Sequence, residues 1–321
     1  MNKDQFIGSI LAGVVADALS ANYTEKITPK IDEIMTSMIT CDGGINKYAA
    51  NSELIINVIK SIINTKGKTN AKDIALTCAN KCSPDRHYND TLFENIKEHP
   101  DKWDCAYKKI YEHGSLDSSS LARIAPIGLM YLSYRDDIGL LDDIKNVLQC
   151  SHMNPESFES CYVFCKLMLL LLCIKNINDY NTIIDECIAY KQLIAINDSD
   201  ELITSLNLVR KLLTEAPEKF DVMTLKNGAK LLTNNTQQSE VITTFVLVLW
   251  CFLFHFEYSD EWHPIVLLKH CILIECRNTS VFGNLIGLLY GSSWIQEFSQ
   301  NIEDYDNIKE LLNEFYSVII T

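Results

Sequence analysis

CILIECRNTSVFGNLIGLLYGSSW, residues 271–294, is an apolar stretch in which glycine recurs at every fourth position, at Gly283, Gly287 and Gly291. A glycine in a helix interior costs about 1 kcal/mol relative to alanine, so three of them on one helical face need a structural reason. Residues without a bulky side chain let two helix backbones approach each other closely. The stretch therefore predicts a helix that packs tightly against a neighbour.

Apolar residues at helical spacing recur along the rest of the chain, whereas strand-like alternation is scarce. The clearest helical segments are 53–63, 138–148, 181–196, 200–213 and 306–320. Two more, 162–174 and 241–254, are apolar on nearly every face and are expected at the centre of the bundle. No low-complexity linker or long charge run divides the sequence. We predict an all-α protein in which residues 1–321 form a single compact domain.

The composition is that of a globular protein with an acidic excess. Lys and Arg number 28 against 42 Asp and Glu, which gives a formal net charge of −14 at pH 7. Such a charge argues against binding nucleic acid or anionic lipid through a general basic field. The run 6–21 imitates a signal peptide but is interrupted by Asp17, and the run 161–177 is broken by Lys166. We therefore expect a cytoplasmic protein with no nucleic-acid partner and no membrane partner.

Twelve cysteines lie within helical patterns rather than in the turn-rich spacing of a disulfide framework. Two pairs, each one helical turn apart, are zinc candidates with His152 nearby: Cys78 with Cys82, and Cys161 with Cys165. Structural zinc sites favour cysteine pairs presented on loops, whereas these pairs flank apolar helical residues. We expect reduced cysteines that pack as small hydrophobic side chains.

Three short segments occur in a definite order along the chain. They are the small-residue helix 7–20, the segment SLARIAPIGLMY at 120–131, and the glycine helix quoted above. In this order they resemble the ADP-ribosylglycohydrolase family, and the resemblance extends over essentially the whole length. It implies an orthogonal multi-helix bundle, in which two magnesium ions serve to remove ADP-ribose from modified proteins or small molecules.

The resemblance can be followed residue by residue through the first segment. ILAGVVADALS is similar to the family's opening helix G-x-A-x-G-D-A-x-G, which Asp17 and Ala18 match. The family then places a glutamate that helps at the metal centre or the reacting sugar. Thr24 aligns with that glutamate, and Glu25 is the next residue in the sequence.

The middle segment is similar to the family's N-G-A-A-M-R-I-A-P-L-G-L, whose start lies beside the ligand phosphates. The matching residues are Arg123, Ile124, Ala125, Pro126, Gly128 and Leu129. Ser118 and Ser119 take the places of the Asn-Gly pair. SHMNPES at 151–157 is likewise similar to a T-H-x-x-P-x-A helix start and retains His152.

The resemblance also locates the family's metal ligands, and their carboxylates are missing. The family's T-D-D-[ST] turn aligns with Ala49, Ala50, Asn51 and Ser52. In the turn G-G-D-T-D-T-N-A before the glycine helix, Ile274 and Cys276 stand for the two aspartates, and Glu275 and Arg277 for the threonines. Magnesium needs oxygen ligands, whereas cysteine sulfur suits softer metals. We expect no magnesium pair, no other cofactor and no metal-assisted hydrolysis.

Three functions fit such a protein. The first is structural, as in the larger class of cubozoan jellyfish lens J-crystallins, which resembles the same family. The net charge would favour solubility, and the expected partner is a second copy of the chain at high concentration. The second is a module that binds an ADP-ribose-like ligand without cutting it, near Glu25, Ser119, Ser120, Arg123 and His152. The third is a divergent ADP-ribosyl hydrolase that uses Glu25, Glu275 or His152. We favour the first.

Overall fold

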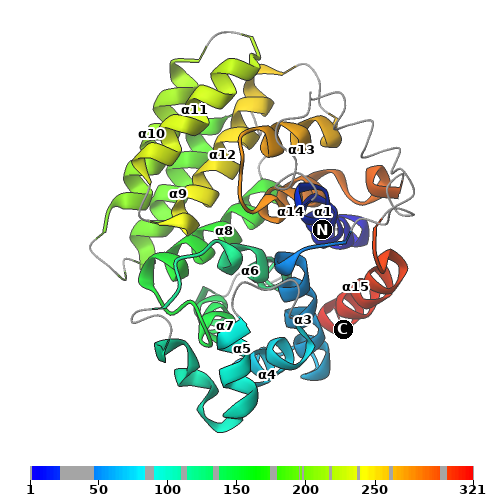
Figure 1. Cartoon of the computed structure of the whole chain (residues 1–321). Coiled ribbons are helices and arrows are strands. Elements are labelled where there is room, and N and C mark those ends of the chain that lie inside the picture. The colour runs from blue at the N-terminus through cyan, green and yellow to red at the C-terminus, as the bar shows by residue number, and fades with distance from the viewer. Residues whose placement is uncertain are drawn as a thin grey trace.

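The computed structural model describes residues 2–21, 47–83, 90–109, 114–132, 137–173, 179–194, 196, 199–216, 219–236, 239–259, 263–296 and 302–320. Throughout these ranges the regular elements are helices and none is a β-strand (Figure 1). They are α1 (Lys3–Ala21), α3 (Ala50–Asn64), α4 (Ala71–Lys81), α5 (Asp90–Glu98), the 3-10 helix η2 (Pro100–Lys109), α6 (Ser119–Met130), α7 (Asp137–Leu148), α8 (Pro155–Cys173), α9 (Tyr180–Ile194), α10 (Glu201–Thr214), α11 (Val222–Asn235), α12 (Glu240–Tyr258), α13 (Pro264–Leu273), α14 (Thr279–Tyr290) and α15 (Tyr305–Ile320).

The predicted all-α class is therefore confirmed, and the five segments expected from their apolar periodicity are α3, α7, α9, α10 and α15. The periodicity is informative because each of these helices buries one face. In α15, for example, Ile308, Leu312 and Phe315 are buried at helical spacing while the residues between them reach solvent. Pro126, which belongs to the family-like segment 120–131, lies inside α6.

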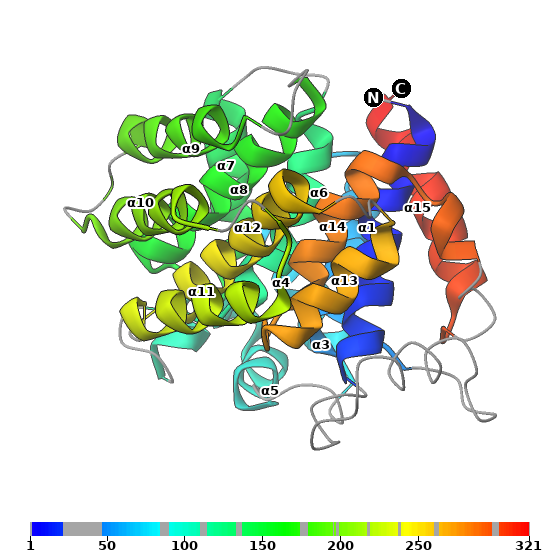
Figure 2. The same ribbon diagram turned by 90° about the horizontal axis from the view of Figure 1, so that it is seen from above.

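The two segments that are apolar on nearly every face form the centre of one half of the molecule. Helices α9, α10 and α11 make an outer layer beside α8 and α12 (Figure 2). Helix α12 buries nearly all of its residues from Val241 to Phe256. By length and composition α12 is also apolar enough to cross a membrane, and 83% of the window that satisfies this criterion is buried inside the protein. Such burial is what the core helix of a large bundle requires.

The glycine helix α14 packs against α1, and this is the most extensive helix pair in the fold. A Cβ atom at Gly287 would lie 2.0 Å from the carbonyl oxygen of Gly8, and one at Gly283 would lie 2.4 Å from that of Ala12. At Gly13 of α1, a Cβ would lie 2.2 Å from Asn284 of α14. The small-residue stripe of the first segment and the glycines of the last are thus two sides of one close contact. The expected tight packing of the glycine helix is confirmed.

Two buried histidines, His255 of α12 and His270 of α13, form an aromatic cluster with the partly buried Phe220. His255 and His270 have ring centroids 5.4 Å apart, and Phe220 stacks on His270 at 4.6 Å. Burial lowers the pKa of His270 to about 4, and the neighbouring His255 and Lys269 add to the effect. An unfolded histidine titrates near its usual pKa of about 6.5, so the unfolded chain binds an extra proton between these two values.

We therefore expect His270 to reduce the stability of the protein as the pH falls from about 6.5 toward 4. In His270→Phe, the melting temperature should fall less between pH 7 and pH 5 than it does in the wild-type chain. Thermal unfolding at both pH values measures this difference. His99→Phe, at an exposed histidine, is the matched control and should behave as wild type. An equal fall in all three proteins would show that His270 does not contribute.

Candidate functional site

The N-termini of α3 and α14 meet the C-terminal part of α1, and this is where the aligned metal positions come together. At the α3 side, Asp17 of α1 is buried and its Oδ2 accepts hydrogen bonds from the backbone N–H groups of Ala49 and Ser52, both at 3.0 Å. The Ser52 hydroxyl donates to the same oxygen at 2.6 Å, and the Asn51 amide donates to Oδ1 at 3.5 Å. Asp17 thus caps a helix whose own N-cap residue, Ala49, has no capping side chain.

Burial and hydrogen bonding shift the pKa of the Asp17 carboxyl in opposite directions. Burial raises its pKa, and the hydrogen bonds from Ser52, Asn51 and Ala49 oppose that rise. Every oxygen of the carboxylate already has a donor from the protein. Asp17 is therefore used to hold the start of α3 against α1.

The turn before α14 has no acidic side chain directed at this point. Ile274 is buried, and the Cys276 thiol lies in the core beside Cys271, whose pKa is raised by burial and by the Cys251 and Cys276 thiols. Glu275 has a backbone φ of 57° and its side chain is exposed to solvent. Arg277 also points outward, with 77% of its side chain exposed, and lies 3.3 Å from a carboxylate oxygen of Glu240.

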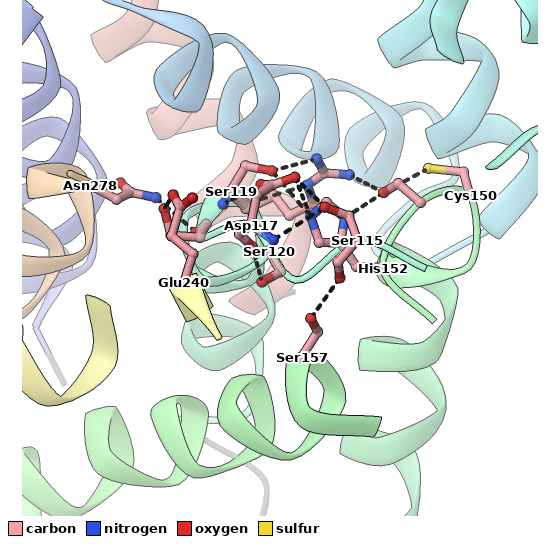
Figure 3. A network of polar contacts seen from close by, with 12 residues as sticks. Ser115, Asp117, Ser119, Ser120, Cys150, His152, Ser157, Glu240 and Asn278 are labelled. Atoms are coloured by element: carbon pink, nitrogen blue, oxygen red, sulfur yellow. Dashed lines mark hydrogen bonds and ion pairs between the residues drawn. The ribbon is translucent and has the colours of Figure 1, made fainter. Parts of the chain in front are cut away.

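Three of the residues predicted to lie near a ligand are brought together at the start of α6. The Arg123 guanidinium is buried and donates to Ser151 Oγ at 2.9 Å and to Ser119 Oγ at 3.1 Å. His152 Nδ1 lies 2.6 Å from Ser151 Oγ, and its Nε2 lies 3.1 Å from Asp117 Oδ2 (Figure 3). These distances fit a chain in which Arg123 donates to Ser151, Ser151 to His152, and His152 to Asp117.

The two charged groups of this hydrogen-bond network, Arg123 and Asp117, are separated by neutral groups. Burial lowers the pKa of His152, with Asp117 opposing the shift and Arg123 reinforcing it. Burial alone would raise the pKa of Asp117, but His152 and hydrogen bonds from Ser115 and Ser119 hold it well below its usual range. A neutral imidazole therefore connects the Arg123 cation to the Asp117 anion. Of the carboxylates described, none lies within 4.0 Å of Arg123.

The other predicted ligand-site residues are placed differently. Ser120 is fully buried and its hydroxyl donates to the Asp117 carbonyl at 3.2 Å, so it stabilises the turn before α6. Glu25 and Thr24 lie outside the described residues. Asn278 is buried and its amide donates to the Ser118 carbonyl at 2.8 Å, which ties the starts of α14 and α6 together.

Two acidic residues of this site were missed by the sequence analysis. Asp117 had a usable signal, because an aspartate just before a helix start commonly accepts from backbone N–H groups, as it does here from Ser119 N at 2.8 Å. Glu240 accepts from the Ser118 hydroxyl at 3.0 Å and pairs with Arg277. These partners are far apart in sequence, and no local pattern indicates their contact.

The residues at the aligned metal positions do not fit a magnesium pair. Ala49, Ala50 and Ile274 have no donor atom, and Cys276 offers a sulfur that is turned into the core. The Asp17 carboxylate at the start of α3 accepts three hydrogen bonds on Oδ2 and one of 3.5 Å on Oδ1. Among the residues that the structure describes, no three His, Cys, Asp or Glu side chains are grouped so as to hold a metal ion. The eleven described cysteines are all free.

Comparison with known proteins connects this site to a family. The sequence model of ADP-ribosylglycohydrolase matches residues 2–321. A solved structure titled "ADP-ribosylglycohydrolase-related protein complex" has a TM-score of 0.63 and 15% sequence identity, and the alignment covers 99% of this chain and 98% of that one. No curated protein sequence matches the chain. At such low identity the structural likeness shows the fold, while the sequence match extends over nearly every residue; the chain belongs to the ADP-ribosylglycohydrolase family.

Proposed function

We propose that this chain is a catalytically silent member of its family with a structural role, of the kind that lens J-crystallins serve as concentrated refractive proteins. The observation that carries the proposal is the environment of Asp17. Its carboxylate binds Ala49, Ser52 and Asn51 at the start of α3, where the family resemblance places metal-binding aspartates. These hydrogen bonds hold the start of α3 through the protein's own groups.

The chemistry of the reaction explains why this replacement would silence the protein. Metal-assisted cleavage of a glycosidic bond depends on cations that orient the sugar and offset developing charge. Magnesium near phosphates is held by carboxylates, and all four aligned aspartate positions have lost theirs. One missing ligand would weaken such a site, whereas the loss of all four removes it. The glutamate that the family uses beside the metals is replaced by Thr24 in the direct alignment.

Properties of the whole chain support a structural role. A formal net charge of −14 keeps molecules apart at high concentration. Nine of the eleven described cysteines are buried, which protects their thiols from oxidation and exchange. The tightest helix contact of the fold, between α1 and α14, is kept by Gly8, Gly283 and Gly287 although the metal turn beside it has changed.

A second candidate, a module that binds an ADP-ribose-like ligand, is favoured by one observation. Arg123 is a buried cation whose hydrogen bonds to the described residues go to serine oxygens, and it reaches Ser119 at the edge of the site. An anionic group of a ligand would be attracted to that position. Against this, Ser118 and Ser119 replace the Asn-Gly pair of the family, and their side chains reduce the approach of phosphates to the backbone.

The first test measures magnesium binding and hydrolysis by the full chain. Isothermal titration with magnesium chloride should show no saturable binding in the micromolar to millimolar range. Peptides carrying ADP-ribose on arginine or serine should release none of it, while a metal-competent family member in the same assay releases it fully. Magnesium-dependent release of ADP-ribose would contradict the proposal and support a divergent hydrolase. For the structural role, the protein should be a dominant fraction of total soluble protein in its tissue.

A ligand titration of the wild-type protein distinguishes the structural role from the binding module. Titration with ADP-ribose should leave the melting temperature unchanged if the role is structural. A saturable rise in melting temperature would favour the binding module instead. The rise would then be lost in Ser119→Val, which removes the half-buried hydroxyl that accepts from Arg123 and leaves Ser151 Oγ as the other side-chain partner of the guanidinium.

A further inference from the structure

A pocket of about 510 Å³ lies among α7, α8 and α9, on elements that take no part in the site described above. Its inner wall is apolar and includes Leu141 of α7, Phe158 of α8 and Ile194 of α9. The volume lies in the range of pockets that hold small organic molecules. The walls alone would favour a ligand with an aliphatic body.

The mouth of this pocket is also apolar. Ile138, Leu193 and Ile196 line it with 75%, 67% and 51% of their surfaces exposed, respectively. These are three of the six large apolar side chains that are exposed among the described residues. Single exposed apolar residues are ordinary, but half of them gathered at one opening mark a surface used for binding.

Two polar side chains give the pocket a chemical preference. Tyr162 of α8 is a lining residue, and within the described part of the chain its buried hydroxyl has no hydrogen-bond partner. Asp137, at the start of α7, also lines the pocket and is bound on one oxygen by Lys166 Nζ at 2.8 Å. Burial and the negative charge of Asp137 raise the pKa of Tyr162 to about 12, so the phenol stays protonated and able to donate.

We propose that this pocket binds a neutral aliphatic alcohol, whose hydroxyl accepts a hydrogen bond from Tyr162 and donates one to Asp137 while its chain packs on Leu141, Phe158 and Ile194. A buried hydroxyl without a partner is unfavourable, and a ligand hydroxyl would satisfy it. The apolar mouth gives the chain of the alcohol a path to the surface.

The charges at the pocket separate this ligand class from its relatives. A fatty-acid carboxylate would face the Asp137 carboxylate, and desolvating it there would be unfavourable. The positive charge of Lys166 is already directed to Asp137, and its ammonium group also lies over the Tyr190 ring at 5.1 Å. An alcohol carries no charge and offers both a donor and an acceptor.

Titration of the full chain with n-octanol, followed by calorimetry and ligand-observed NMR, tests the proposal. We expect saturable binding to one site per chain and about fivefold weaker binding to Tyr162→Phe, which loses one hydrogen bond and keeps the ring. Tyr305→Phe is the matched control, because the Tyr305 hydroxyl is also buried without a partner among the described residues but lies outside the pocket. It should bind as wild type.

A second pair of variants tests the location. Leu141→Trp should fill the pocket and abolish binding, whereas Leu231→Trp, an equal change on exposed α11, should not. The proposal is overturned if n-octanol does not bind, if n-octanoate binds more tightly, or if Tyr162→Phe binds as wild type. It is also overturned if sedimentation shows a dimer that Leu193→Ser dissociates, since a second copy would then cover the mouth. None of these results depends on whether the protein hydrolyses ADP-ribose.

Discussion

Gly287→Ala is expected to destabilise the protein by about 3 kcal/mol, at the upper end of the usual range for overpacking. The new Cβ would lie 2.0 Å from the Gly8 carbonyl oxygen and 2.4 Å from its carbonyl carbon. Both atoms belong to the backbone of α1, so no side-chain rotation relieves the overlap. The two helices must separate along their whole contact, and the core on both sides must repack.

The sign of this effect distinguishes it from a helix-propensity effect. Alanine is the better helix former by about 1 kcal/mol, so Gly287→Ala would stabilise α14 if nothing opposed it. Urea unfolding at neutral pH gives the free-energy difference. Gly128→Ala in α6 is the matched control, because its Cβ would meet the flexible Met168 side chain, with the sulfur at 2.8 Å. We expect a loss of less than about 1.5 kcal/mol there. Equal stabilities in the two variants would refute the close-packing explanation.

Five helices of this fold, α3, α7, α9, α10 and α15, were predictable because each carries its own periodic pattern. Helix α12, apolar all round, could be placed in the core from its composition alone. The partner of α14 was not predictable in this way. Ser9 of α1 donates to the Asn284 carbonyl at 2.9 Å across 275 positions of sequence, and small residues indicate only that some helix approaches closely. Their complementarity becomes visible only when both helices are seen together.

The candidate site was also predictable only in part. The loss of the metal carboxylates at 49–52 and 274–278 could be inferred by alignment to the family motifs, since it concerns which residues are present. The directions of the side chains could not be inferred. Arg277 turns outward to Glu240, and Cys276 turns into the core toward Cys271. These directions follow from packing among α12, α13 and α14, for which the local sequence carries no signal.

Asp17→Ala is the second change with a large expected effect, a loss of about 3 kcal/mol in the free energy of unfolding. The substitution leaves the Ala49 and Ser52 N–H groups at the start of α3 without their acceptor, and the buried Ser52 hydroxyl without its partner. Part of this loss is offset because burial, which raises the pKa of Asp17, also makes the ionised carboxylate costly. Asp17→Asn keeps one acceptor oxygen and should lose about half as much.

Whether Asp17→Ala lowers or raises the free energy of unfolding tests the proposed role of Asp17. A buried carboxylate kept for metal chemistry is commonly held at the expense of stability, so its removal leaves the fold equally or more stable. A carboxylate kept as a helix cap gives the opposite result. Urea unfolding of the wild-type chain and both variants, in chelator and in magnesium chloride, decides between these cases. Large losses that are independent of magnesium would show that Asp17 serves the fold. A stabilised Asp17→Ala would contradict the capping role, and a wild-type chain that magnesium stabilises through Asp17 would show that a metal ion still binds there.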